Sequence, residues 1–134
     1  MDRFRIEGGR RLEGTVRISG AKNAALPAMA AALLTAEPVH LQNIPRVRDI
    51  TTMGKLLAHM NARVTTAEVP PIDLTIEAPS ILDAEAPYEL VRTMRASILT
   101  LGPTLSRLGR GANQGEIGVV LDGKYYGITA YAEE

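Results

Sequence analysis

Hydrophobic and charged residues alternate near the amino-terminal end of the chain. Phe4 and Ile6 alternate with charged residues, a glycine pair follows, and a second apolar series runs from Leu12 to Ile18. Alternation with a period of two is typical of a strand with one buried face, and the glycines indicate a turn. The pattern predicts a hairpin over residues 1–20.

The next segment, residues 21–36, is apolar around most of a helical circumference. Its sequence, AKNAALPAMAAALLTA, carries a single charge and is rich in alanine and leucine, which are strong helix formers. Pro27 is tolerated in a first turn, which places the helix start near Asn23. The segment therefore predicts a buried helix that ends at Glu37-Pro38.

Short strands and a second helix follow. A strand is predicted near residues 39–44, and Asp49 is a plausible N-cap for a helix that reaches about Asn61. Apolar residues in that helix recur at spacings of three and four, which indicates one buried face. Another strand begins at Val64, and residues 72–77 alternate apolar and polar positions as a half-buried strand does.

The last third of the chain predicts one more helix and a hairpin. The helix runs from Ala86 to about Leu105 on an apolar stripe, with a bend expected at the Gly-Pro pair of residues 102–103. A glycine-rich connection follows it. Two apolar runs then flank the Asp-Gly pair at 122–123, a strong signal for a two-residue β-hairpin.

The predicted order of elements is ββ, α, β, α, ββ, α, ββ, which indicates an α/β chain of the α+β type with helices packed on a mixed sheet. The length predicts a single domain over residues 1–134. Within it we expect the hairpin (1–20), a first repeat (21–78) and a shortened second repeat (79–134). The chain would then hold about one and a half copies of one repeat.

Charge and cysteine content narrow the range of functions. Lys and Arg number 15, as do Asp and Glu, so the chain has no net positive field to attract nucleic acid or an anionic membrane. It contains no cysteine, which excludes a disulfide scaffold and a thiolate metal site, and His40 and His59 have no partner at ligand spacing. No stretch resembles a signal sequence or a membrane span. We expect a soluble cytoplasmic protein that binds neither nucleic acid nor membranes.

Lys22 is the first candidate functional residue. It lies in Ser19-Gly20-Ala21-Lys22-Asn23, where a strand gives way to a helix and free backbone N–H groups can bind an anion. A lysine in a first helical turn opposes the helix dipole, and a bound anion would remove that conflict. The alternative is a solvated lysine beside an asparagine cap.

Arg92 and Arg95 are the second candidates. They are three residues apart on the predicted third helix, so both could contact one phosphate or carboxylate. The alternative is an exposed ion-pair face, with Glu89 three residues before Arg92.

Two longer motifs carry a family resemblance. The segments SGAKNAALP and PYELVRTMRAS are similar to motifs of the enolpyruvyl transferases, and the similarity runs from Met1 to about Arg110. The resemblance implies two domains of βαβαββ repeat units, of the α/β prism kind, around a cleft. It also implies transfer of the enolpyruvyl group from phosphoenolpyruvate to the 3-hydroxyl of UDP-N-acetylglucosamine, a step of peptidoglycan synthesis, without a metal or organic cofactor.

The same resemblance assigns roles to four residues. Lys22 matches a catalytic lysine that contacts phosphoenolpyruvate, and Asn23 matches an asparagine that contacts the sugar. Arg95 matches the arginine that lines the same site, and Ala96 is expected beside it on the sugar side. Fixed cations of this kind stabilise the charge that develops when a phosphate-bearing substrate reacts.

The tail departs from the family pattern. After Gly111 the family continues into a loop with a catalytic cysteine or aspartate and a GARPVD-like segment, whereas this chain continues as ANQGEIGVVLDGKYYGITAYAEE. The second domain is missing too, so a cleft needs that domain or another copy of the chain as partner. Two functions stay open: an incomplete part of an enolpyruvyl transferase, inactive as an isolated chain, or a non-catalytic repeat domain with weak anion binding.

Overall fold

The computed structural model describes residues 3–67, 71–83, 85–108, 110–113, 118–121, 124–127 and 130–131. Its helical elements are α1 (Lys22–Ala31), the 3-10 turn η1 (Ala32–Leu34), α2 (Arg48–His59), α3 (Tyr88–Val91), the 3-10 turn η2 (Arg95–Thr100) and α4 (Leu101–Leu108). Its strands are β1 (Val39–Ile44), β2 (Arg63–Thr66), β3 (Ile72–Glu77), β4 (Glu85–Ala86), β5 (Arg110–Asn113), β6 (Gly118–Leu121), β7 (Lys124–Gly127) and β8 (Ala130–Tyr131).

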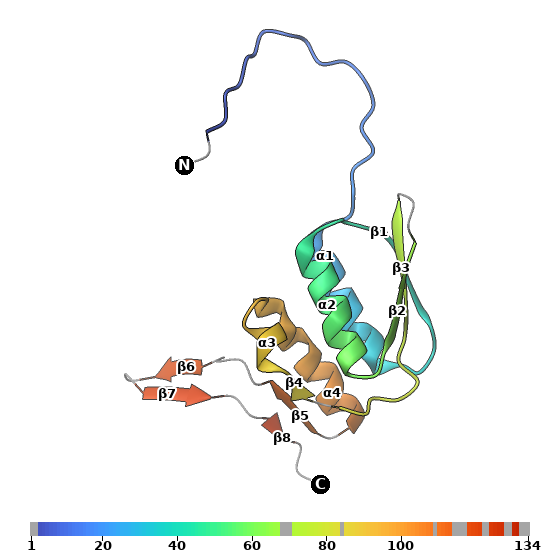
Figure 1. Ribbon diagram of the computed structural model, residues 1–134, viewed down its shortest axis with the longest axis vertical. Coiled ribbons are helices and arrows are strands. Elements are labelled where there is room, and N and C mark those ends of the chain that lie inside the picture. The colour runs from blue at the N-terminus through green and yellow to red at the C-terminus, as the bar shows by residue number, and fades with distance from the viewer. Residues whose placement is uncertain are drawn as a thin grey trace.

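The first half of the body is a helix pair on one face of a three-stranded sheet (Figure 1). The strand order is β1-β3-β2, both pairings are antiparallel, and Ile76 of β3 pairs with Val39 on one side and Val64 on the other. Helix, strand, helix, strand and strand follow one another as the hydrophobic pattern predicts. The expected α/β class, with helices packed on a sheet, is confirmed.

Aliphatic and methionine side chains form the core between the helices and the sheet. Ile50, Met53, Leu57 and Met60 are the predicted stripe of α2, and all four are buried. They recur at the spacing that places side chains on one face of a helix. The alanine-rich α1 packs against α2 along its length, because small side chains allow two helices to approach closely.

The predicted hairpin over residues 1–20 is wrong for the described residues. Residues 3–19 form an extended segment, which we call the N-terminal arm, and it leaves the body without pairing to a strand (Figure 1). Its apolar side chains are exposed, with Phe4 at 96% and Leu12 at 94%. A two-stranded hairpin alone is marginally stable, so alternation without a third strand to pair with does not produce a sheet.

The predicted third helix is divided into three pieces. The break falls at residues 92–94, where Met94 adopts an extended conformation (φ −148°, ψ 106°), and not at the Gly-Pro pair. Pro103 is the third residue of α4, which follows the 3-10 turn η2 directly. The break therefore lies roughly nine residues, or more than two helical turns, before the Gly-Pro pair.

The described strands from β4 onward form two small sheets. β6 and β7 pair antiparallel with Leu121 opposite Lys124, which confirms the predicted hairpin, although the Asp-Gly turn itself lies outside the described residues. β5 pairs in parallel with β4 and antiparallel with β8. The division into a first and a shortened second repeat stays a prediction.

Candidate functional site at the starts of two helices

The segment before α1 is fixed to the end of β1 by backbone contacts. The N–H of Gly20 donates to the carbonyl of Asn43 at 2.9 Å, and the side-chain amide of Asn43 donates to the carbonyl of Ile18 at 3.3 Å. Asn43 has a positive φ of 56°, and its own N–H donates to Asp73 Oδ1 at 2.9 Å. This left-handed residue, which asparagine tolerates better than most, brings the start of α1 beside the segment that leads into α2.

Lys22 and Asp49 meet at these helix starts. Lys22 is the first residue of α1 and Asp49 is the second residue of α2, and Lys22 Nζ lies 2.8 Å from Asp49 Oδ2. Asp49 is not the N-cap that the sequence predicted: that position belongs to Val47, which has no side-chain capping bond. The carboxylate forms a charge-assisted hydrogen bond across the two helices instead.

The electrostatic setting explains this pair. A carboxylate in a first turn is stabilised by the helix dipole by about 0.3–1 kcal/mol, and a lysine there is disfavoured to a similar extent. The pair therefore offsets the unfavourable placement of Lys22. The ion pair itself contributes little to the free energy of folding, because the two side chains are 47% and 35% exposed and such pairs contribute about 0.2–1 kcal/mol.

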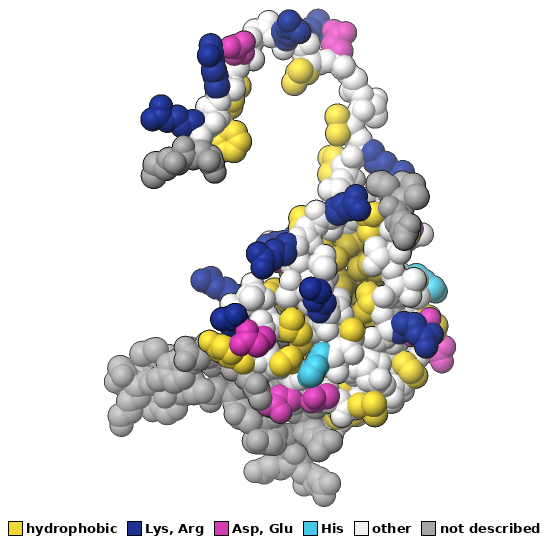
Figure 2. Space-filling view, viewed as in Figure 1, with side chains coloured by type: hydrophobic (Ala, Val, Ile, Leu, Met, Phe, Trp, Pro, Cys, Tyr) yellow, Lys and Arg dark blue, Asp and Glu magenta, His cyan; other side chains and the backbone are white. Residues whose placement is uncertain are grey.

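Basic residues surround the two helix starts. Figure 2 shows Lys and Arg side chains over the end of the body from which the N-terminal arm leaves. The chain segments that meet there, 14–23 and 43–49, carry Arg17, Lys22, Arg46 and Arg48 and the carboxylate of Asp49, and a second carboxylate, that of Asp73 in β3, accepts the N–H of Asn43. This end of the molecule has the charge that an anionic ligand requires.

Asn23 stands next to Lys22 and is exposed, as the second residue of α1. The helix begins at Lys22, one residue before the predicted start, so Pro27 lies in the helix interior. Pro27 has no N–H to donate to the carbonyl of Asn23, four residues earlier. Lys22 and Asn23 thus share the first turn of α1, and their joint role in a site stays a prediction.

Arg95 and Ala96 lie on a different element. They are the first two residues of η2, which packs against α1. Arg95 is exposed, and within the described part of the chain no ion pair holds it, whereas Ala96 is half-buried against the core. The structure gives no contact between Arg95 and Lys22, so their joint role stays a prediction.

Arg92 forms an exposed ion pair with Glu89, which is the alternative that the sequence left open. Its Nε lies 2.8 Å from Glu89 Oε2, and its guanidinium lies 6.0 Å from the ring centroid of Tyr88. The interruption at residues 92–94 places Arg92 and Arg95 in separate elements. The expectation that both share one helix face is therefore wrong.

Sequence patterns missed two residues that organise this region, Asn43 and Asp49 as a partner of Lys22, and they missed Arg107, which acts beyond the other end of α1. Arg107 donates from its guanidinium to the carbonyls of Leu33, Thr35, Ala78 and Pro79. The signal for Asn43 was the Asn-Ile-Pro sequence at the end of β1, because asparagine tolerates positive φ and proline ends strands. The partners of Asp49 and Arg107 are distant in sequence, and no local pattern points to them.

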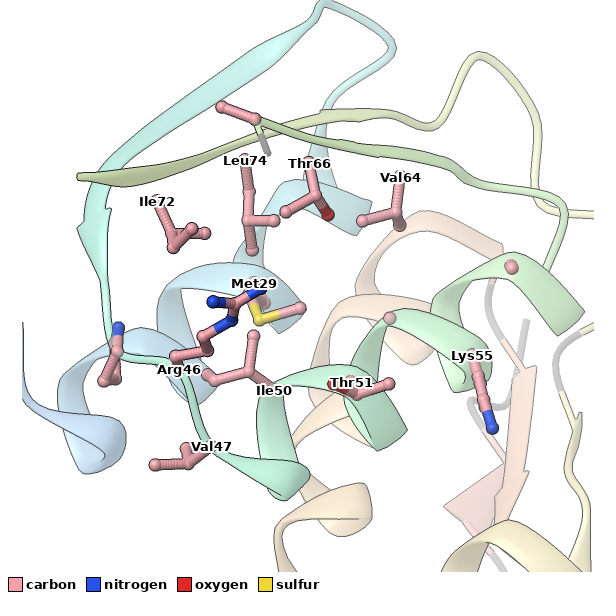
Figure 3. A pocket seen from close by; sticks show the side chains of 14 residues that line it. Met29, Arg46, Val47, Ile50, Thr51, Lys55, Val64, Thr66, Ile72 and Leu74 are labelled. Carbon is pink, nitrogen blue, oxygen red and sulfur yellow. The ribbon is translucent and has the colours of Figure 1, made fainter. Parts of the chain in front are cut away.

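A solvent-open cleft of about 830 Å³ lies between α2 and the sheet (Figure 3). Ile50 and Thr51 of α2 face Val64 of β2 and Leu74 of β3 across it. None of Lys22, Asn23, Arg95 and Ala96 lines this cleft. This cleft is therefore separate from the predicted site residues.

The two histidines make local contacts. His40 Nδ1 lies 3.0 Å from Thr75 Oγ1, and His59 Nε2 lies 3.2 Å from Asp83 Oδ2. Among the described residues, no three His, Cys, Asp or Glu side chains are grouped as a metal ion would require. In the described segments no helix is both long and apolar enough to cross a membrane.

Comparisons with known proteins place these features in a family. The model of the family described as EPSP synthase (3-phosphoshikimate 1-carboxyvinyltransferase) matches residues 6–126. The chain is 52% identical over 110 residues to the UDP-N-acetylglucosamine 1-carboxyvinyltransferase of Anaeromyxobacter dehalogenans (strain 2CP-C), a match that covers 82% of this chain and 26% of the relative. The corresponding proteins of Solibacter usitatus and Saccharophagus degradans are 54% and 53% identical over the same shares of the two chains.

A solved structure agrees with the sequence matches. The crystal structure of the enolpyruvyl transferase NikO from Streptomyces tendae superposes with a TM-score of 0.67 at 30% identity, covering 78% of this chain and 24% of that chain. The chain spans about a quarter of the length of the relatives it matches. With its paired helices on a sheet and its SGAKNAALP segment at the start of α1, the chain belongs to the enolpyruvyl (carboxyvinyl) transferase family, and it corresponds to a part of such an enzyme.

Proposed function

We propose that this chain is one part of an enzyme that transfers the enolpyruvyl group from phosphoenolpyruvate to the 3-hydroxyl of UDP-N-acetylglucosamine. The relatives at 52–54% identity that bear the name of that transferase support this assignment. The observation that carries it is the placement of Lys22 and Asn23 in the first turn of α1, beside the start of α2. The reaction would serve peptidoglycan synthesis in the cytoplasm.

The residues would act on the phosphate-bearing substrate. Lys22 would donate from Nζ to the phosphate of phosphoenolpyruvate, and Arg95 would offer its planar pair of N–H groups to a phosphate or carboxylate. Addition of the sugar O–H across the enolpyruvyl double bond forms a C–O bond and places a proton on the methylene carbon. Loss of inorganic phosphate, together with a proton from that carbon, then restores the double bond. Asn23 and Ala96 would lie on the side of the sugar.

We propose that the isolated chain binds its anionic substrate weakly and does not complete this reaction. It has no cysteine to supply the family's loop nucleophile or acid, and it spans about a quarter of its relatives. A half-open site leaves a bound anion partly hydrated, which weakens each charge interaction. A second domain, or a second copy of the chain, would have to close the site. The non-catalytic alternative is a repeat domain that only binds anions. Such a domain would not act on the UDP-sugar.

Backbone amide shifts during titration with phosphoenolpyruvate test the binding site. At low salt we expect the amides of residues 20–25 to move, with a Kd on the order of 1 mM, or about 4 kcal/mol, that weakens as salt is added. Lys22→Ala and Arg95→Ala should each weaken binding several-fold. Phosphorus spectra of the same samples, with UDP-N-acetylglucosamine added, would reveal any release of inorganic phosphate.

Two charge-matched variants serve as controls. Lys55→Ala removes an exposed lysine from a later turn of α2, and Arg92→Ala removes an arginine that is paired with Glu89. Neither should change the affinity. The proposal is wrong if residues 20–25 do not respond at low salt, or if they respond equally in the Lys22→Ala, Arg95→Ala double variant.

A further inference from the structure

Asp49 is the one carboxylate in the two chain segments that meet at the starts of α1 and α2. Its Oδ2 lies 2.8 Å from Lys22 Nζ, although the two residues are 27 positions apart. The nearby Asp73 accepts the N–H of Asn43 through Oδ1 and is engaged with β1. The negative charge beside Lys22 therefore comes from Asp49.

The two partners differ in mobility. Asp49 has a short side chain on the first turn of α2, so its carboxylate stays close to that helix start. Lys22 carries its ammonium group on a flexible four-carbon stem with three N–H donors. The aspartate therefore determines where the ammonium group lies when no ligand is bound.

An anion that approaches Lys22 Nζ also approaches Asp49 Oδ2. Like charges repel at this distance, so a ligand phosphate gains attraction from the lysine and loses part of it to the aspartate. The pair is partly exposed, at 47% and 35%, and water can solvate either partner when it opens. A phosphate with two negative charges can then replace the carboxylate on Nζ.

We propose that Asp49 is a positioning residue and the resident counter-ion of Lys22, with which the phosphate of the substrate competes. This inference rests on the proposed function, because it concerns the same lysine. In the unliganded chain Asp49 holds Nζ between the two helix starts. On binding, the phosphate takes over the ammonium group, and the aspartate returns to water at the first turn of α2.

Titration of the labelled chain with inorganic phosphate at low salt tests this proposal. Asp49→Asn keeps the size of the side chain and removes its charge, so we expect the affinity at residues 20–25 to rise on the order of 5-fold. The increase should shrink in high salt. Asp49→Ser gives a second variant if the asparagine form does not show the dispersed amide spectrum of the folded chain.

Asp83→Asn is the matched control. It also removes one carboxylate charge close to α2, but from the opposite end of the helix, where Asp83 pairs with His59. The two ends of this helix are roughly 16 Å apart at 1.5 Å per residue, whereas Asp49 lies 2.8 Å from Lys22 Nζ, so a charge at Asp83 acts far more weakly on a phosphate bound there. Asp83→Asn should therefore change the affinity for phosphate much less than Asp49→Asn does.

A double-mutant cycle with Lys22→Met separates competition at the lysine from a general effect of charge. If Asp49 acts through Lys22, the gain from Asp49→Asn disappears in the Lys22→Met background. An unchanged or lower affinity of Asp49→Asn, or a gain that persists without Lys22, overturns the inference. If phosphate moves residues 20–25 in the original chain and not in Lys22→Met, the proposed anion site survives that result. If neither the original chain nor Asp49→Asn responds to phosphate, both proposals fall.

Discussion

At the scale of single residues, the contact between Gly20 and Asn43 fixes where α1 begins. The N–H of Gly20 donates to the carbonyl of Asn43, and a Cβ atom on Gly20 would collide with that same carbonyl oxygen. Backbone cannot move aside as the end of a flexible side chain can. The small size of this one residue therefore permits the approach that places Lys22 beside Asp49.

We expect Gly20→Ala to lower the free energy of unfolding by about 1–3 kcal/mol, because the added methyl group forces the two segments apart. Gly54→Ala is the matched control. Its Cβ would meet only Val64 Cγ1 at 3.8 Å, and alanine is favoured over glycine inside a helix by about 0.5–1 kcal/mol. Urea unfolding should therefore give changes of opposite sign, and equal stability of the two variants would contradict this account.

At the scale of elements, Arg107 joins parts of the chain that are distant in sequence. Its Nη1 donates to the carbonyls of Leu33, Thr35 and Ala78 at 2.9, 3.1 and 2.6 Å, and its Nη2 donates to Pro79 at 3.0 Å. These carbonyls lie at the end of η1 and just beyond the end of β3. One side chain of α4 thus satisfies acceptors from a helix end and a strand end together.

Arg107→Met keeps an apolar stem of similar length and removes every donor. We expect it to lower the free energy of unfolding by about 2–4 kcal/mol, because partly buried carbonyls lose charge-assisted bonds. Arg107→Lys should recover part of this loss, since an ammonium group cannot reach all of the acceptors. Arg92→Met, at an exposed ion pair, should cost less than about 0.5 kcal/mol by the same denaturation measurement. Equal losses at positions 92 and 107 would rule out the proposed role.

The sequence predicted those elements whose signal is local and missed those that depend on distant partners. The apolar stripe of α2 and the alternation of β3 need only the 3.6-residue and 2-residue periods, and both were placed correctly. The break at residues 92–94 contains neither glycine nor proline, so no local signal marked it. Lys22 was found because it conflicts with its own helix, whereas its partner Asp49 comes from another element. The family motif supplied the roles of Asn23 and Arg95, which their surroundings alone do not reveal.

At the scale of the whole molecule, the N-terminal arm contributes little to the stability of the body. Its large apolar residues, among them Phe4, Ile6 and Val16, are 81–96% exposed, and its contacts with the body begin only near Ile18. Side chains that stay in water on folding gain no hydrophobic free energy. The arm carries the alternation of a strand without the sheet that a strand requires.

A chain that starts at Arg17 should therefore have the same free energy of unfolding as the whole chain, within about 0.5 kcal/mol, and the same denaturant midpoint. Ile18 is kept, so the hydrogen bond from Asn43 to its carbonyl remains. Starting the chain at Lys22 removes Gly20 as well and should lower the midpoint. If loss of the arm alone destabilises the body as much as loss of Gly20, its side chains are buried in solution.

The position of Arg107 also has a consequence for the order of events during synthesis. It follows Thr35 by 72 residues and Ala78 by 29 residues. A ribosome that adds roughly 5–20 residues per second needs about 4–14 s to travel from the first of these acceptors to their donor. The sheet and its two helices become complete in sequence at Glu77, 30 residues before Arg107, and until Arg107 emerges water solvates the carbonyls that the guanidinium will bind. The earlier half of the body thus reaches its full stability only after the later half emerges, and a nascent chain stopped before Arg107 leaves that half open to proteases.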